Sequence, residues 1–284
     1  AAAQPVEGVG LFRTEFLFLD RDTMPTVEEQ TATYTEVFTA FGDRRVVVRT
    51  LDAGADKPLK FADLGPEENP ALGRRGLRLG MIRTDVMDTQ LQALANAYQA
   101  TGADVRVMAP MVATQAEATW FAERVRALGL PKVGVMIEVP AAAIRSRGIL
   151  YHVDFASLGT NDLQQYTMAA DRMQGELAAL LNPWEPALLD VVALACDGGQ
   201  AMGKPIGVCG EAGGDPALAL VLAGLGVSSL SMAPGKVPAV RTSLSLHTRE
   251  QCQQMAAAAR AAVDAAGARA AVLAMADPVL LDLI

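Results

Sequence analysis

The sequence is poor in cysteine, histidine and aromatic residues, and it contains no long hydrophobic run. Its three cysteines (Cys196, Cys209 and Cys252) are too few for a disulfide framework and lack the spacing of a metal site. No apolar run reaches the roughly 20 residues that span a bilayer, and no signal-peptide pattern opens the chain. We therefore expect a cytoplasmic protein with reduced thiols and no membrane association.

Positive charge is also scarce, because 24 Lys+Arg face 32 Asp+Glu and give a formal net charge of −8. This balance argues against a general nucleic-acid binder, which needs a basic face to displace counterions. Only five of the positive residues are lysines, and the other nineteen are arginines. The planar guanidinium fork matches phosphate and carboxylate, so arginine clusters in an acidic protein predict local anion binding.

Apolar residues make up 51% of the chain, which excludes disorder and provides a large core. Their pattern alternates between short β-rich runs and longer Ala-rich helical stretches. We expect strands at residues 9–12, 46–51, 105–108, 133–139, 153–158, 206–209 and 227–232, with a weaker eighth candidate at 76–81. We expect helices at residues 26–40, 89–100, 114–128, 141–147, 186–202 and 216–225, and a long one at 249–266.

Strands that alternate with helices predict a parallel sheet, and nearly continuous apolar runs indicate strands buried on both faces. Eight such strands predict an α/β fold of the (β/α)₈ TIM-barrel type. A doubly wound open sheet is the alternative. No low-complexity linker divides the chain, so we expect a single domain over residues 1–284, and we interpret it as one domain of a longer polypeptide.

Barrel enzymes carry their active sites at the C-terminal ends of the strands. The charged, polar or thiol side chains at these positions are Arg13 with Glu15, Arg49 with Asp52, the arginines Arg74, Arg75 and Arg78, then Glu138, Asn161 with Asp162, and Cys209 with Glu211. Arginine forks suit phosphate and carboxylate, and two carboxylates from neighbouring strands suit Mg²⁺. Cys209 could be a thiol acid or a nucleophile, although a free cysteine is more commonly a small buried hydrophobe. Together these residues predict Mg²⁺-dependent chemistry on a small anionic ligand that carries phosphate.

Several motifs resemble the phosphoenolpyruvate-utilising family, and within it the C-terminal domain of the enzyme I type from the bacterial sugar phosphotransferase system. The resemblance runs from about residue 7 to about residue 240. Its motifs are GVGLFRTEFLF (8–18), VRTLD (48–52), ENPALG (68–73), EVPA (138–141), GTNDL (159–163), DR (171–172) and CGE (209–211).

The resemblance implies a role for each matching residue. Four arginines would hold the phosphate and carboxylate of phosphoenolpyruvate, namely Arg13, Arg49, Arg75 and Arg172, with Asn161 as a phosphate-binding amide. Glu138 and Asp162 would bind Mg²⁺, for which Mn²⁺ could substitute. Cys209 would protonate the enolate to give pyruvate.

The resemblance also implies partners. The protein would be a phosphoenolpyruvate–protein phosphotransferase that acts as a homodimeric barrel in the first step of sugar uptake. Its phosphoryl-accepting histidine would lie on a separate N-terminal domain that this sequence does not include, and a histidine-containing phosphocarrier protein would follow. The alternatives are the equivalent domain of pyruvate phosphate dikinase or phosphoenolpyruvate synthase, and a non-catalytic barrel that only binds. Arg74 departs from the family pattern, because many relatives carry an aromatic residue there, and residues 232–236 differ as well.

Overall fold

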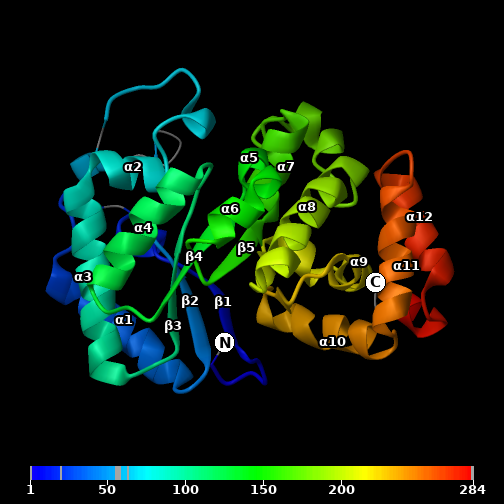
Figure 1. Cartoon of the computed structure of the whole chain (residues 1–284), viewed down its shortest axis with the longest axis horizontal. Coiled ribbons are helices and arrows are strands. Elements are labelled where there is room, and N and C mark those ends of the chain that lie inside the picture. The colour runs from blue at the N-terminus through cyan, green and yellow to red at the C-terminus, as the bar shows by residue number, and fades with distance from the viewer. Residues whose placement is uncertain (1, 20, 55–58, 63, 283–284) are drawn as a thin grey trace. The chain divides into compact units, whose positions relative to one another are not determined.

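The computed structural model describes residues 2–19, 21–54, 59–62 and 64–282 (Figure 1). The chain divides into two compact units, residues 2–136 and residues 137 onward. Within the described residues, no helix is long and apolar enough to cross a membrane.

The first unit is built on four parallel strands in chain order, β1 to β4. Its elements are β1 (Gly8–Arg13), α1 (Val27–Phe41), β2 (Arg45–Arg49), α2 (Leu77–Ile82), α3 (Thr84–Thr101), β3 (Val105–Ala109), α4 (Gln115–Ala127) and β4 (Lys132–Ile137), the last of which ends at the boundary between the units. Helices α1 and α3 pack against each other. Strands β2, β3 and β4 are mostly buried, as their continuous apolar runs predict.

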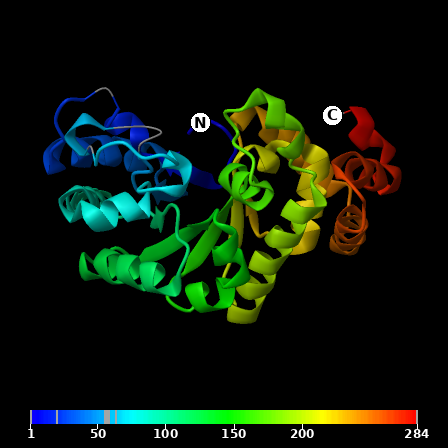
Figure 2. The same ribbon diagram turned by 90° about the horizontal axis from the view of Figure 1, so that it is seen from above.

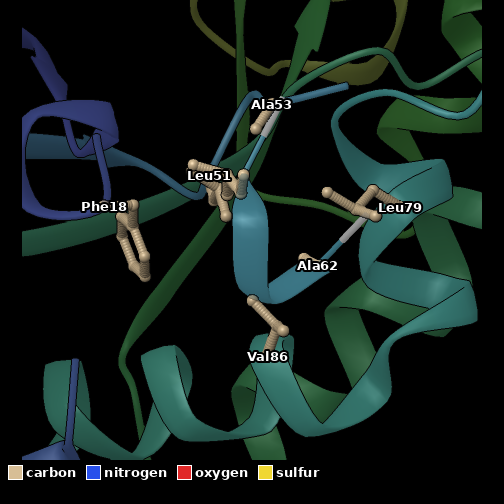
Figure 3. Close-up of a cluster of buried hydrophobic side chains, with 7 residues drawn as sticks. Phe18, Leu51, Ala53, Ala62, Leu79 and Val86 are labelled. Atoms are coloured by element: carbon tan, nitrogen blue, oxygen red, sulfur yellow. The ribbon is translucent and has the colours of Figure 1, made fainter. Parts of the chain in front are cut away.

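A hydrophobic cluster fixes the loops that follow the first two strands. Phe18 comes from the segment after β1, Leu51 and Ala53 come from the segment after β2, and Val86 comes from α3 (Figure 3). All of them are buried. The segments that directly follow Arg13 and Arg49 are therefore anchored by apolar packing.

The second unit continues the same pattern with parallel strands β5, β6 and β7 in chain order. Its elements are α5 (Pro140–Ile144), α6 (Ser146–Leu150), β5 (Phe155–Gly159), α7 (Thr160–Met168), α8 (Pro186–Met202), β6 (Ile206–Cys209), α9 (Pro216–Leu225), β7 (Ser229–Leu230), α10 (Val237–Ser245), α11 (Arg249–Arg260) and α12 (Ala265–Met275). Helices α11 and α12 lie side by side and pack on α9 (Figure 2).

The predicted fold class is confirmed. All the strand pairs described within the two units are parallel, the strands follow chain order in each unit, and helices connect them, as in a (β/α)₈ barrel. A doubly wound sheet would place β1 inside a reversed order, so that alternative is wrong. Local caps begin two of the helices, because the Thr114 hydroxyl accepts a hydrogen bond from the Glu117 backbone N–H at the start of α4 and the Asp215 carboxylate caps α9.

The prediction of a weak eighth strand at residues 76–81 is wrong, because helix α2 occupies this segment. The alternation of Leu77 and Leu79 with polar or small residues imitates a strand, yet Gly76 adopts a φ of 58° and its carbonyl accepts the helical hydrogen bond from the Gly80 N–H. Without a side chain, Gly80 also allows the Met87 side chain of α3 to pack closely. This tertiary contact selects a helix where the local pattern was ambiguous.

The long C-terminal helix expected at residues 249–266 is also two helices. Helix α11 ends at Arg260, and the Asp264 carboxylate accepts a hydrogen bond of 2.7 Å from the Gly267 N–H to begin α12. The Ala-rich composition hides this break, because alanine favours helix on both sides of it. Helices α7 and α10 lie outside the expected helices. Since α7 follows β5 with no intervening turn, no separate turn segment in the sequence marks the start of this helix.

Candidate active site

The first unit brings three of the predicted ligand arginines to the C-terminal ends of its strands. Arg13 ends β1, Arg49 ends β2, and Arg75 directly precedes Gly76 and helix α2. Arg49 and Arg75 are buried, whereas the Arg13 side chain is about half exposed at 48%. Two guanidinium groups are therefore fixed in the interior and a third reaches toward solvent.

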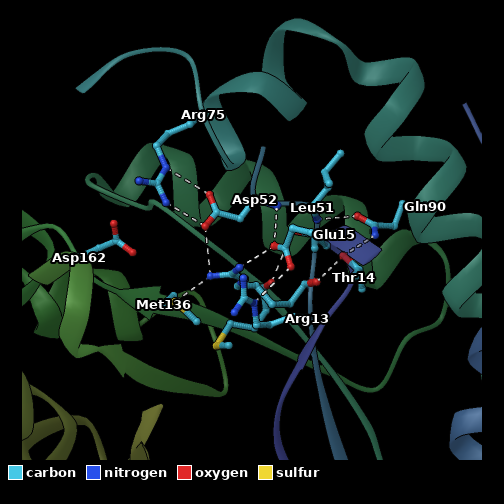
Figure 4. A network of polar contacts seen from close by, with 12 residues as sticks. Arg13, Thr14, Glu15, Leu51, Asp52, Arg75, Gln90, Met136 and Asp162 are labelled. Atoms are coloured by element: carbon cyan, nitrogen blue, oxygen red, sulfur yellow. Dashed lines mark hydrogen bonds and ion pairs between the residues drawn. The ribbon is translucent and has the colours of Figure 1, made fainter. Parts of the chain in front are cut away.

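Two buried carboxylates hold these arginines. Glu15 accepts a 2.5 Å hydrogen bond from Arg49 Nη2, and its Oε2 lies 3.6 Å from Arg13 Nε. Asp52 Oδ2 lies 3.1 Å from Arg49 Nη1 and 2.9 Å from Arg75 Nη2, so one oxygen bridges two arginines (Figure 4). Arg49 is shared between both acids, which restricts its guanidinium plane to one orientation.

The cluster presents guanidinium donors that carboxylates hold in place. Glu15 and Asp52 fix Arg49 and Arg75 in the interior, and the half-exposed Arg13 reaches solvent beside them. Guanidinium forks match phosphate and carboxylate, so this arrangement suits an anionic ligand.

A layer of neutral hydrogen bonds supports the strand ends beneath the arginines. Gln90 on α3 accepts a hydrogen bond of 2.9 Å from the Leu51 N–H and donates to the Thr14 and Tyr34 hydroxyl groups at 3.0 Å each. The Thr14 hydroxyl in turn donates to the Arg49 carbonyl at 2.9 Å. Burial raises the pKa of the Tyr34 phenol far above its ordinary value, so this hydroxyl stays neutral.

The second unit carries the remaining predicted residues at the ends of its own strands. Glu138 directly follows β4 and is buried, and Asp162 lies in the first turn of α7, immediately after β5, and is 7% exposed. Cys209 is the last residue of β6 and pairs in register with Gly159 of β5. Its buried thiol donates a hydrogen bond of 3.5 Å to the Leu158 carbonyl.

Arg172 comes to the same strand end through the turn that follows α7. Its backbone N–H donates to Gln165 Oε1 at 3.0 Å, and its Nη1 lies 3.5 Å from Asp162 Oδ2. Asn161 is exposed, one residue before Asp162. The structure therefore brings Asn161, Asp162 and Arg172 together on one helix and its following turn.

Each unit thus gathers its own share of the predicted site. The first unit assembles Arg13, Arg49 and Arg75, and the second places Glu138, Asn161, Asp162, Arg172 and Cys209 at or beside strand ends. Sequence reasoning missed the roles of Glu15 and Asp52, although both stand in quoted motifs directly after strands. The signal that could have identified them was their negative charge, because buried arginines need nearby carboxylates.

Comparison with known proteins identifies the family of the chain. Residues 1–249 match the family described as PEP-utilising enzyme, PEP-binding domain. The chain is 56% identical over 267 residues to the phosphoenolpyruvate-protein phosphotransferase of Streptomyces coelicolor, covering 93% of this chain and 48% of that protein. It is 45% identical over 262 residues to the multiphosphoryl transfer protein of Xanthomonas campestris, covering 90% and 31%.

A third relative is the phosphoenolpyruvate-protein phosphotransferase of Bacillus subtilis, at 38% identity over 259 residues with 87% of this chain and 45% of that protein covered. The chain therefore spans about half the length of such relatives, or less. The resemblance read from the motifs is confirmed, and the chain belongs to the phosphoenolpyruvate-utilising enzymes, of which it contains the phosphoenolpyruvate-binding domain.

Proposed function

We propose that this chain binds phosphoenolpyruvate with Mg²⁺ and acts as the phosphoryl-donor half of a phosphoenolpyruvate–protein phosphotransferase. The observation that carries the proposal is the buried cluster in which Glu15 and Asp52 hold Arg49 and Arg75 in fixed positions beside the half-exposed Arg13. A phosphate or carboxylate group accepts hydrogen bonds from such preorganised guanidinium donors. The names of the relatives support this substrate over a barrel that only binds.

The residues of the second unit fit a magnesium ion. Glu138 and Asp162 are both buried carboxylates at or beside strand ends, and carboxylate oxygen is the donor that Mg²⁺ prefers. Among the described residues, no group of three His, Cys, Asp or Glu side chains gathers into a metal cage. Two carboxylates with ligand and water oxygens are the usual set for Mg²⁺ beside a phosphate. When bound, the ion would neutralise developing charge on the phosphoryl group and the enolate.

The arginines perform the remaining electrostatic work. Arg49 and Arg75 are held before any ligand arrives, so little reorganisation is needed to bind the phosphate or carboxylate of phosphoenolpyruvate. Arg172 beside Asp162, together with the Asn161 amide, provides further donors. Phosphoryl transfer depends mainly on such positioning and charge stabilisation.

Cys209 completes the reaction as the proton donor. The P–O bond of phosphoenolpyruvate breaks as a P–N bond forms on the histidine of the partner domain, and an enolate remains. The electron pair of the enolate C=C bond then takes the proton from Cys209 Sγ, which gives pyruvate and a thiolate that water reprotonates. The hydrogen bond from Sγ to the Leu158 carbonyl holds the Cys209 side chain at its place beside the strand ends.

The wider assignment follows from the same proposal. The accepting histidine lies on a separate N-terminal domain, and the phosphoryl group then passes to a histidine-containing phosphocarrier protein. These transfers are the first step of sugar uptake and take place in the cytoplasm. The chain acts as one barrel domain that forms a homodimer.

The test has a binding arm and a transfer arm. Calorimetry of the chain with phosphoenolpyruvate should give binding that requires Mg²⁺ or Mn²⁺, and metal-independent binding or none would contradict the proposal. Cys209→Ala should retain binding but lose phosphoryl transfer when the histidine domain is supplied separately. Cys196→Ala is the matched control, since Cys196 is another buried cysteine, on α8, and its variant should transfer normally. Unchanged transfer in Cys209→Ala would remove the thiol from the mechanism.

A further inference from the structure

Arg74 closes a short loop just before the ligand residue Arg75. Its Nε and its backbone N–H both donate to Glu67 Oε1, at 2.7 and 2.9 Å. Its two terminal nitrogens donate to the carbonyls of Leu64 at 2.9 Å and Gly65 at 3.4 Å. One arginine thus uses four donors to tie residues 64–67 to residue 74, which an aromatic side chain at this position could not do.

The loop accommodates this arrangement at Gly73. A Cβ atom at position 73 would lie 2.4 Å from Glu67 Oε2, so the carboxylate occupies the space that any other residue would fill. The Glu67 side chain is only 13% exposed. The hydrogen bonds from Arg74 hold the pKa of Glu67 below its ordinary value, so the carboxylate is charged at neutral pH.

The same segment is packed against residues 53–54, which follow the strand that carries Arg49. A Cβ atom at Gly54 would lie 2.5 Å from the Arg75 Cβ, and the Gly76 N–H donates to the Ala53 carbonyl at 3.0 Å. Arg75 is therefore confined by the chain of residues 53–54 on one side. The Glu67–Arg74 pair fixes the backbone on its N-terminal side.

We propose that Glu67 and Arg74 form a clasp that positions the Arg75 guanidinium for an anionic group of the ligand, an inference that rests on the proposed function. Asp52 sets where the tip of Arg75 points, through contacts of 2.9 and 3.3 Å. The clasp sets where its backbone starts. Neither clasp residue needs to touch the ligand, so both are positioning residues.

The clasp is tested with Glu67→Gln, and Asp85→Asn is the matched control. Asp85 forms a comparable pair with Arg83 in the same unit, at 2.9 and 2.7 Å, and Arg83 also donates to the Phe61 carbonyl at 2.9 Å. Glu67→Gln should weaken Mg²⁺-dependent phosphoenolpyruvate binding about tenfold, because even a small misplacement of the Arg75 guanidinium weakens its contact with the anionic group of the ligand. Asp85→Asn should bind as the wild type does.

Two readouts separate positioning from general destabilisation. In an Arg75→Ala background, Glu67→Gln should cause no further loss of binding, because both changes act through the same guanidinium. Without any ligand, the ¹⁵N relaxation of the Arg75 Nε–H group should indicate a rigid side chain in the wild type and a mobile one in Glu67→Gln. If Glu67→Gln does not fold, Arg74→Lys keeps the charge but loses the fork, and it should give the same direction of change.

The outcomes are distinguishable from those of the proposed function. If the wild type does not bind phosphoenolpyruvate, the proposed function fails, while the relaxation measurement still decides the clasp. An Arg75 Nε–H that stays as rigid in Glu67→Gln as in the wild type would overturn the clasp. A binding loss that persists in the Arg75→Ala background would also overturn it.

Discussion

Asp52 is the side chain on which the arginine cluster depends most, and Asp52→Asn tests this directly. The substitution preserves size and shape but removes the negative charge between Arg49 and Arg75. One oxygen of Asp52 contacts both guanidinium groups, at 3.1 and 2.9 Å, and all three side chains are buried. The variant therefore leaves the buried guanidinium groups of Arg49 and Arg75 facing a neutral amide, while Glu15 still pairs with Arg49.

The expected cost can be worked from these contacts. At an effective dielectric constant of about 20, each pair of charges separated by about 4 Å interacts by about 4 kcal/mol, so the two pairs together give about 8 kcal/mol. Removing the carboxylate also removes its desolvation penalty of several kcal/mol. The amide oxygen retains hydrogen bonds worth about 1 kcal/mol each. We expect Asp52→Asn to lower the free energy of unfolding by about 3 kcal/mol, in line with other broken buried ion pairs.

The assay is urea unfolding followed by tryptophan fluorescence in a Trp184→Phe background, where Trp120 of α4 reports on the unit that contains Asp52. Asp85→Asn is the control, since its carboxylate is exposed and such pairs are worth less than about 1 kcal/mol. If Asp52→Asn lies within about 0.5 kcal/mol of the wild type, the cluster is not the electrostatic unit described above.

Three further predictions concern other parts of the chain. Gly224→Ala should lower stability by about 2 kcal/mol in thermal melts, because its Cβ would lie 2.0 Å from the Cys252 carbonyl oxygen and two helices would have to separate. His247→Phe should cost about 1–2 kcal/mol and speed hydrogen exchange at the Asp277 amide, which donates to His247 Nε2 at 2.9 Å. Because the pKa of Glu67 is lowered in the folded state, its carboxylate stabilises the fold fully above the ordinary carboxyl pKa, and this stabilisation is lost as the pH falls through the lowered pKa. The difference in unfolding free energy between wild type and Glu67→Gln should therefore shrink on acidification. A difference that stayed constant would contradict the lowered pKa.

Much of the fold follows from local sequence because its signals are local. Continuous apolar runs of four to six residues specify buried parallel strands, and helix starts at Thr114 and Asp215 are encoded within three residues. The motifs also name the family, since most of them consist of neighbouring residues at a strand end. Position along the chain was therefore enough to raise Arg13, Arg49, Arg75 and Cys209 among the candidates, whereas Arg172 was assigned only through the family resemblance.

The tertiary structure decided what depends on residues far apart in sequence. Glu15 and Arg49 meet because β1 and β2 pair in register. Asp52 joins Arg75 because the segment just before α2 lies against the residues that follow β2, where the Gly76 N–H donates to the Ala53 carbonyl. Ion pairs between distant segments produce no periodic pattern in the sequence. Composition therefore gives the number of arginines but does not identify the carboxylates that pair with them. The sequence by itself determined the chemistry of the site, and three-dimensional packing determined which carboxylates hold that chemistry in place.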